Sequence, residues 1–356
     1  MAAVAAADEG DRDVRHYLYV VCPGIRDYLD FGGAGILVFD MDHDHRFVKR
    51  IASPASLEEK PDNIKGVCAN AANRRLYFTT RAKLCCIDLV SEQPLWERAL
   101  ADGTDRMSIT PDGKLIYVPS FEKDTWHVVA ADTGEPIATI ETKSGAHNTV
   151  VSRDGLRMYL GGLKSPMLFV ADTQTHSIVQ KVGPFGGSIR PFTVNGARTR
   201  AYVCVNDLLG FEIGDLASGK MLHRVEVTGF AVGPVKRHGC PSHGIGLPPD
   251  EKEVWVVDAF NQQVHVFDNT VEPPKQDQSI GVREQPGWIT FSLDGEFGYP
   301  STGEVIGVTR KRILTTLADD AGRQVHSEKM VEVDFQDGMP VAVGDQFGVG
   351  RVVPAK

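Results

Sequence analysis

The chain has 356 residues, of which 42% are hydrophobic and 24% charged, and its formal net charge at pH 7 is −9. This is the composition of an ordinary globular protein with enough apolar residues for a large core. The acidic balance disfavours non-specific nucleic-acid binding, which needs a basic surface. No run of about 18–20 apolar residues is present that would span a membrane. We therefore expect neither nucleic acid nor membrane as a partner.

The start of the chain, Met1–Gly10, has neither a basic segment nor a long apolar core, so it does not resemble a signal peptide. The six cysteines form no C-x-x-C pair, which favours reduced thiols. We expect a cytoplasmic protein, the alternative being a secreted or periplasmic one whose leader has been removed. Residues 1–14 are expected to be a disordered tail, and residues 15–353 a single domain.

A turn followed by an aromatic strand recurs along the chain. The successive aromatic residues lie 40, 42, 43, 53 and 44 positions apart. A period near 40 residues is typical of propellers and solenoids. The repeated aromatic residues are Tyr77, Tyr117, Tyr159, Tyr202, Trp255 and Tyr299.

A second pattern is an apolar strand that ends at an aspartate and is followed by a polar hairpin turn, as at Asp40, Asp132 and Asp268. Helical periodicity is nowhere sustained. Each unit therefore predicts a four-stranded antiparallel blade, and seven such units predict an all-β, seven-bladed β-propeller. The first unit starts at its second strand. We expect its inner strand to come from the C-terminus, Met330–Phe335 or Pro340–Gly350, so that the terminal strands pair and close the ring.

The repeated P-D-G-x-x-x-Y-V turn and strand, followed by D-x-x-T-G-type turns, resembles the YVTN or YncE-like β-propeller repeat family over about residues 15–350. The resemblance implies the propeller fold. It implies little about function, because that family includes both enzymes and binding proteins.

Two insertions interrupt the regular spacing, at residues 23–33 and 227–240. In a propeller, loops after the second strand and loops leading into the first strand lie on one face. Both insertions are therefore expected on the same face, which is the predicted functional side.

The repeat allows equivalent positions to be compared within the chain. The residues twelve positions before each aromatic are expected where the inner strands begin, at the mouth of the central channel. Most of them are ionisable, which predicts a site there, the alternative being an ordinary solvated mouth. They are Lys65, Asp105, His147, Arg190, His243 and Gly287.

Two chemistries fit these residues. Three converging imidazoles, His147, His243 and His326, are predicted to bind a divalent metal ion such as Zn, Mn, Cu or Ni, with open positions for water or substrate. For each histidine taken singly, a structural hydrogen-bonding role is the alternative. Oxygen ligands or orienting partners are sought among Asp105, Asn148, Glu328 and Gln346.

The second chemistry is recognition of an anion by a local cluster of positive charge. Ordinary salt bridging is the alternative for the cations, and blade packing for the tryptophans. The predicted substrate-binding residues are Arg26, Lys65, Arg106, Trp126, Arg190, Lys236, Arg237 and Trp288. The candidate catalytic residues are Tyr28, Asp105, Arg190 and His238.

These patterns predict a metal-dependent enzyme of lyase or hydrolase type. Its substrate is expected to be a small anionic molecule that binds in the channel mouth. Carbohydrate-derived examples are a carboxylated sugar and a lactone. The alternative is a non-catalytic propeller that binds a ligand or a protein on the same face.

Overall fold

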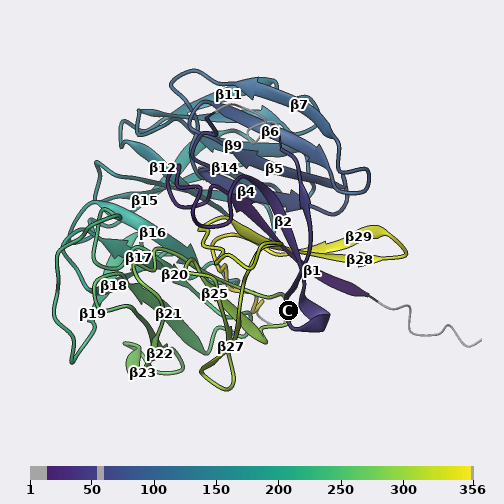
Figure 1. Ribbon diagram of the computed structural model, residues 1–356. Coiled ribbons are helices and arrows are strands. Elements are labelled where there is room, and N and C mark those ends of the chain that lie inside the picture. Colours follow the sequence, from purple (N-terminus) through teal and green to yellow (C-terminus); the bar gives the residue numbers. More distant parts are fainter. Residues whose placement is uncertain (1–13, 54–59, 354–356) are drawn as a thin grey trace, which may run out of the picture.

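The computed structural model describes residues 14–53 and 60–353. Of the tail predicted at residues 1–14, residues 1–13 lie outside this part of the chain. The described residues form seven antiparallel sheets arranged in a ring (Figure 1). The predicted seven-bladed all-β propeller is therefore confirmed.

Blade 1 contains five strands, and blades 2 to 7 contain four each. The strands of blade 1, in sheet order, are β29 (Met339–Val343), β28 (Met330–Gln336), β1 (Arg15–Cys22), β2 (Gly35–Asp40) and β3 (Arg46–Ile51). One short 3-10 helix, η1 (Met41–His43), joins β2 to β3. Blade 2 is β4 (Gly66–Asn70), β5 (Arg75–Thr79), β6 (Lys83–Asp88) and β7 (Pro94–Ala99). Blade 3 is β8 (Ser108–Ile109), β9 (Leu115–Pro119), β10 (Thr125–Ala130) and β11 (Pro136–Glu141).

The remaining blades follow the same order from the inner to the outer strand. Blade 4 is β12 (Ala146–Val151), β13 (Arg157–Gly162), β14 (Leu168–Asp172) and β15 (Ser177–Val182). Blade 5 is β16 (Ile189–Val194), β17 (Arg200–Val205), β18 (Gly210–Asp215) and β19 (Lys220–Glu226). Blade 6 is β20 (Ile245–Gly246), β21 (Glu253–Asp258), β22 (Gln263–Asp268) and β23 (Lys275–Gly281). Blade 7 is β24 (Ile289–Phe291), β25 (Phe297–Pro300), β26 (Glu304–Gly307) and β27 (Arg312–Thr316).

The ring closes where the two ends of the chain meet in blade 1. The C-terminal strand β28 pairs antiparallel with the N-terminal strand β1, with Tyr19 opposite Val331. Of the two segments predicted for this role, the first, near Met330–Phe335, is the one that pairs with β1. Closure by such pairing leaves no open edge between the first and last blades.

The repeated aromatic residues lie between blades, which explains why they recur. Their rings are buried, and several of their hydroxyls bond to the following blade. The Tyr77 hydroxyl donates to the Ala131 carbonyl of blade 3 at 2.9 Å. The Tyr299 hydroxyl lies 2.8 Å from the His45 Nε2 of blade 1. The aromatic residues thus contribute apolar contact area between blades, and several of the tyrosines add a polar contact to the next blade.

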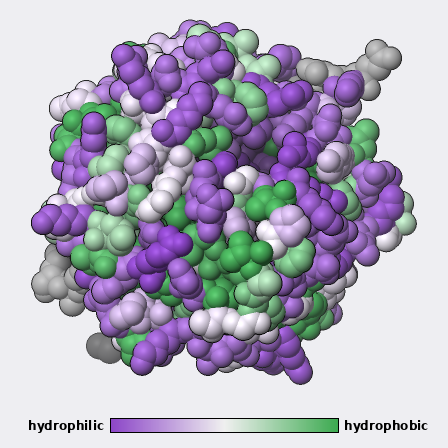
Figure 2. All heavy atoms as spheres, turned by 90° about the vertical axis from the view of Figure 1, so that its left-hand side faces the viewer, coloured by the Kyte–Doolittle hydropathy of each residue, from purple (hydrophilic) through white to green (hydrophobic). Residues whose placement is uncertain are grey.

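The outer strands carry mostly exposed and half-buried side chains, as in β15 and β19. Figure 2 shows one side of the ring, where hydrophilic side chains cover most of the surface and apolar ones are interspersed. Among the described residues, no helix is both long and apolar enough to cross a membrane.

The segment that follows β29 runs across the end of the central channel opposite the insertions. Gln346 Oε1 accepts from the Val67 amide at 2.8 Å, and its Nε2 donates to the Glu328 carbonyl at 3.0 Å. The Gly348 carbonyl accepts from the Thr193 hydroxyl at 2.8 Å and from the Leu247 amide at 2.9 Å. Residues 344–352, which we call the C-terminal plug, therefore bond to inner strands of several blades and form a floor beneath the channel mouth.

Candidate functional site

The seven blades place one equivalent residue each at the mouth of the channel. In every blade the aromatic residue pairs with a residue of the inner strand, and the equivalent position lies three residues before that partner. The pairs include Tyr77 with Cys68 and Tyr159 with Val150. The seven positions are Glu328, Lys65, Asp105, His147, Arg190, His243 and Gly287.

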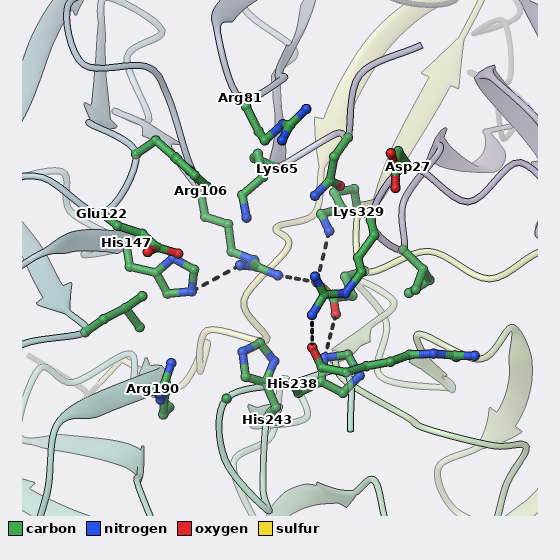
Figure 3. Close-up of a pocket in the computed structure, with 18 residues that line it drawn as sticks. Asp27, Lys65, Arg81, Arg106, Glu122, His147, Arg190, His238, His243 and Lys329 are labelled. Atoms are coloured by element: carbon green, nitrogen blue, oxygen red, sulfur yellow. Dashed lines mark hydrogen bonds and ion pairs between the residues drawn. The ribbon is translucent and has the colours of Figure 1, made fainter. Parts of the chain in front are cut away.

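Five of these residues line a cavity of about 350 Å³ (Figure 3), and the other two, Asp105 and Gly287, do not. Both predicted insertions reach it, residues 25–27 from the first and residues 237–239 from the second. Trp288 and Gln346 lie below the cavity, where the Trp288 Nε1 donates to the Gln346 carbonyl at 2.6 Å. The cavity therefore opens on the face that carries the insertions and is closed by the C-terminal plug.

His147 and Asp105 form a buried pair in the cavity wall. His147 Nδ1 lies 2.6 Å from Asp105 Oδ2, and His147 Nε2 lies 3.3 Å from Arg106 Nη1. Arginine only donates, so Nε2 accepts and Nδ1 carries the proton that is donated to Asp105. Burial lowers the pKa of His147 despite the opposing charge of Asp105. The imidazole is therefore neutral, with its basic nitrogen towards Arg106 and the cavity.

Asp105 stays ionised although it is buried. Burial on its own would raise the pKa of Asp105, but His147, Lys65 and Arg106 hold it well below its usual range. Lys65 Nζ lies 3.5 Å from Asp105 Oδ1, and the Arg106 amide donates to the same oxygen at 3.0 Å. Asp105 therefore orients His147 and two cations, but it does not itself line the cavity.

Glu328 links the cations in the middle of the site. Its Oε2 accepts from Arg106 and, at 2.9 Å, from Lys329 Nζ. Burial would raise the pKa of Glu328, but Lys329, Arg106 and His238 hold it well below its ordinary value. Burial lowers the pKa of Lys329 to about 7 against the influence of Glu328. The Arg106 guanidinium also stacks 4.4 Å from the ring centre of Trp288, and its buried Nε has no hydrogen-bond partner among the described residues.

His238 and His243 stack on each other beside Glu328, with ring centres 4.9 Å apart and planes inclined by 24°. His238 Nδ1 lies 3.3 Å from Glu328 Oε1. Burial lowers the pKa of both imidazoles, that of His243 well below its usual value. A β-carbon at Gly287 would lie only 2.1 Å from the His238 ring, so this glycine is needed for His238 to reach its position.

Strand irregularities position two further side chains. The pairing of β12 with β13 shifts between Ala146 and Asn148, and that of β16 with β17 shifts between Ile189 and Phe192. His147 and Arg190 lie in these bulges, which turn a side chain out of the regular alternation. Arg190 Nε donates to Asn206 Oδ1 at 2.5 Å, and its guanidinium forms no ion pair among the described residues. It therefore faces the cavity as an uncompensated cation.

The rim of the cavity is formed by the insertions. Arg26 donates to the Arg237 carbonyl at 2.7 Å and so ties the two insertions together. The Arg237 guanidinium packs 5.8 Å from the ring centre of Tyr28 and 5.5 Å from that of Phe31. Arg26 and Arg237 line the cavity, whereas Tyr28, which is 38% exposed, does not.

The structure does not bring the three predicted metal ligands together. His147 and His243 both line the cavity, but His326 stacks on Phe31 with ring centres 4.4 Å apart and lies outside it. The prediction was wrong because His326 lies two positions too early in the chain. In the segment that leads into β28, Glu328, and not His326, occupies the position equivalent to Lys65 and His147.

Three predicted substrate contacts also lie outside the cavity lining. Trp126 is completely buried within the blades and donates to the Thr149 hydroxyl at 2.8 Å. Trp288 supports Arg106 from below, and Lys236 is exposed on the insertion. The other predicted substrate-binding residues do line the cavity. They are Arg26, Lys65, Arg106, Arg190 and Arg237.

Sequence reasoning missed the central place of Glu328 and the part played by Lys329. Glu328 entered only as one of four possible oxygen ligands or orienting partners. Counting back from Tyr19 does not find it, because its strand β28 comes from the other end of the chain. Lys329 directly follows Glu328, and its Nζ donates to the Gly24 carbonyl at 2.8 Å.

Comparison with known proteins bears on the fold. No protein-family model and no curated protein matches the sequence. Among solved structures, the β-propeller domain of Myceliophteria thermophila Cps50 (Swd1) is similar, with a TM-score of 0.60, 12% identity and coverage of 84% of this chain and 98% of that one. The dihydro-heme d1 dehydrogenase NirN, in complex with DHE, has a TM-score of 0.61, 11% identity and coverage of 92% and 72%. These likenesses show the seven-bladed propeller fold, while the closer resemblance to YVTN or YncE-like repeats stays a prediction.

Proposed function

We propose that the channel mouth binds a small anionic molecule, such as a carboxylated sugar or its lactone, and acts on it by lyase or hydrolase chemistry. The observation that carries this proposal is the excess of positive charge around the cavity. Seven cationic side chains line it against three carboxylates. They are Arg26, Lys65, Arg81, Arg106, Arg190, Arg237 and Lys329.

This excess stands out because the whole chain is acidic, with a formal net charge of −9. A cationic recess in an acidic protein focuses the field and attracts anions to that point. The uncompensated guanidinium of Arg190 is suited to a bidentate contact with a carboxylate. A cavity of about 350 Å³ is of a size to hold a single small molecule.

His147 supports the acid–base part of the proposal. A neutral imidazole, held in one tautomer by a buried aspartate, is an arrangement that general bases use. With the substrate carboxylate on Arg190, His147 Nε2 would release its hydrogen bond from Arg106 and accept a proton from the adjacent carbon or from a water molecule. Lys65 and Arg106 would stabilise the negative charge that develops.

The two similar propellers do not decide between catalysis and binding. One is described as a dehydrogenase in complex with DHE, and the other as a propeller domain of Cps50 (Swd1). The proposal therefore depends on the cavity of this chain.

Calorimetric titration with galacturonate and glucuronate, against the neutral sugars galactose and glucose, tests the proposal. We expect binding of an acid and no binding of its neutral counterpart. Arg190→Gln should weaken acid binding by about tenfold or more, since a charge-assisted hydrogen bond contributes about 1.5–3 kcal/mol. Arg157→Gln is the matched control, because Arg157 is paired with Asp172 away from the cavity.

Equal binding of acids and neutral sugars, or an Arg190→Gln variant with unchanged affinity, would contradict anion recognition by this cavity. Product analysis of the same mixtures then separates the two classes of function. Tight binding with no conversion of any acid favours the non-catalytic ligand-binding alternative.

A further inference from the structure

We propose that His238, His243 and Glu328 bind a divalent transition-metal ion in the wall of the cavity. One donor atom from each can be chosen so that all three lie within 4.8 Å of one another. This site shares only His243 with the three histidines predicted from the sequence, and Glu328 with the oxygen ligands considered there. It extends the proposed function by adding a Lewis acid, but its existence does not depend on the identity of the anion.

Backbone carbonyls orient both imidazoles for metal binding. His238 Nε2 donates to the Gln285 carbonyl at 3.2 Å, and His243 Nδ1 donates to the Gly287 carbonyl at 3.1 Å. A carbonyl only accepts, so each of these nitrogens carries the proton. In the neutral imidazoles the opposite nitrogen is left with a free lone pair. Metal-binding histidines have this arrangement, with the second nitrogen bonded to a carbonyl or carboxylate.

His238 and Glu328 present their free donor atoms at a separation that suits a shared metal ion. His238 Nδ1 and Glu328 Oε1 are 3.3 Å apart. Ligand bonds of about 2 Å at a tetrahedral angle separate neighbouring donor atoms by a comparable distance.

Glu328 is held so that one oxygen remains available. Its Oε2 accepts from both Arg106 and Lys329, which leaves Oε1 for the histidines. The two cations also oppose a bound dication, so an anion in the cavity should favour metal binding by offsetting their charge. Two nitrogen donors and one oxygen donor suit Zn²⁺ and neighbouring first-row ions, with positions left for water or substrate.

The test is a titration of untagged, chelator-treated protein with Zn²⁺ alone. We expect one Zn²⁺ per chain. His243→Ala and Glu328→Gln should each weaken binding by about 100-fold or more, since even the loss of an orienting partner costs about 10–100-fold. His326→Ala is the matched control and should bind as the wild type does, because His326 belongs to the sequence-predicted set but lies outside the cavity.

Melting curves establish that each variant is folded, and Glu328→Gln keeps the size and shape of the native side chain. As a second measurement, Cu²⁺ bound to the wild-type protein should show two nitrogen ligands by electron paramagnetic resonance. Absence of stoichiometric Zn²⁺ binding, or loss of binding in His326→Ala but not in His243→Ala, overturns this site.

The acid titrations of the proposed function are repeated in chelator to keep the two proposals separate. Acid binding that depends on Arg190 but occurs without Zn²⁺ uptake leaves the anion site intact and removes the metal site. Zn²⁺ uptake without acid binding leaves the metal site intact and removes the anion site.

Discussion

At the scale of single residues, the orientation of His147 depends on Asp105. The aspartate accepts from Nδ1, and Arg106 donates to Nε2, so both ring nitrogens have defined roles. Asp105 is fully buried, and the cations around it keep it ionised. A neutral amide in its place would change the tautomer of the imidazole without changing the shape of the site.

Asp105→Asn should reverse the tautomer of His147, because an amide NH₂ group donates where the carboxylate accepted. If the asparagine NH₂ faces the ring, Nδ1 becomes the acceptor and Nε2 carries the proton towards Arg106. We expect kcat for a converted acid to fall by about 10²–10⁴-fold while its binding changes little. Nitrogen-15 NMR of the histidines reports the tautomer independently of any substrate. An unchanged His147 spectrum, or a fall in affinity equal to the fall in kcat, would argue against an orienting role.

At the scale of single elements, β28 has two functions. It closes the ring by pairing with β1, and the two residues immediately before it, Glu328 and Lys329, complete the cavity.

Strand β28 also carries a buried acidic pair, Glu332 and Asp334. Glu332 Oε2 accepts from the Leu293 amide at 2.6 Å, and burial together with the charge of Asp334 raises the pKa of Glu332 to about 9.

This acidic pair should make the ring closure sensitive to pH. An unfolded glutamate loses its proton near pH 4.3, whereas folded Glu332 keeps it to about pH 9. The native state therefore binds the extra proton, and this group's contribution to stability is lost as pH rises between these values. Glu332→Gln stays neutral throughout, so its Tm should exceed that of the wild type at pH 8, by roughly 2 °C or more. The difference should shrink towards pH 4.

Thermal unfolding of both proteins across this pH range measures the effect. Glu296→Gln serves as the control, because Glu296 is exposed on the neighbouring turn between β24 and β25. A Tm difference that is constant with pH would show that Glu332 does not hold the proton.

At the scale of the whole molecule, the last part of the chain contributes to stability in two separable ways. Strand β28 joins the first and last blades, whereas the C-terminal plug fills the channel below the site. In the plug, Phe347 is buried against Trp288 with ring centres 5.8 Å apart, and Glu251 Oε1 accepts from the Val352 amide at 2.8 Å. Loss of the plug should therefore weaken the floor, while loss of β28 opens the ring.

Two truncations separate these effects. A chain that ends at Val343 keeps the closure and should unfold cooperatively at a lower Tm, because removing a buried phenylalanine alone costs about 3–5 kcal/mol. A chain that ends at Lys329 lacks β28 and should show no cooperative transition, since β1 would expose an unpaired edge. Circular dichroism melting of both chains measures this. A retained transition in the shorter chain would show that the blades are stable without closure.

The repeat pattern of the chain was enough to predict the fold, the number of blades and most of the positions around the channel mouth. It did so because a repeat of about 40 residues puts equivalent residues in equivalent places, as for Lys65, His147, Arg190 and His243. Only the tertiary structure showed that Glu328 completes the ring, because its strand comes from the other end of the chain. Only the tertiary structure likewise separated His326 from the cavity and set His238 and His243 against Glu328. Residue spacing within one strand records position along the chain, but the direction and partners of a side chain depend on bulges, insertions and neighbours far away in sequence.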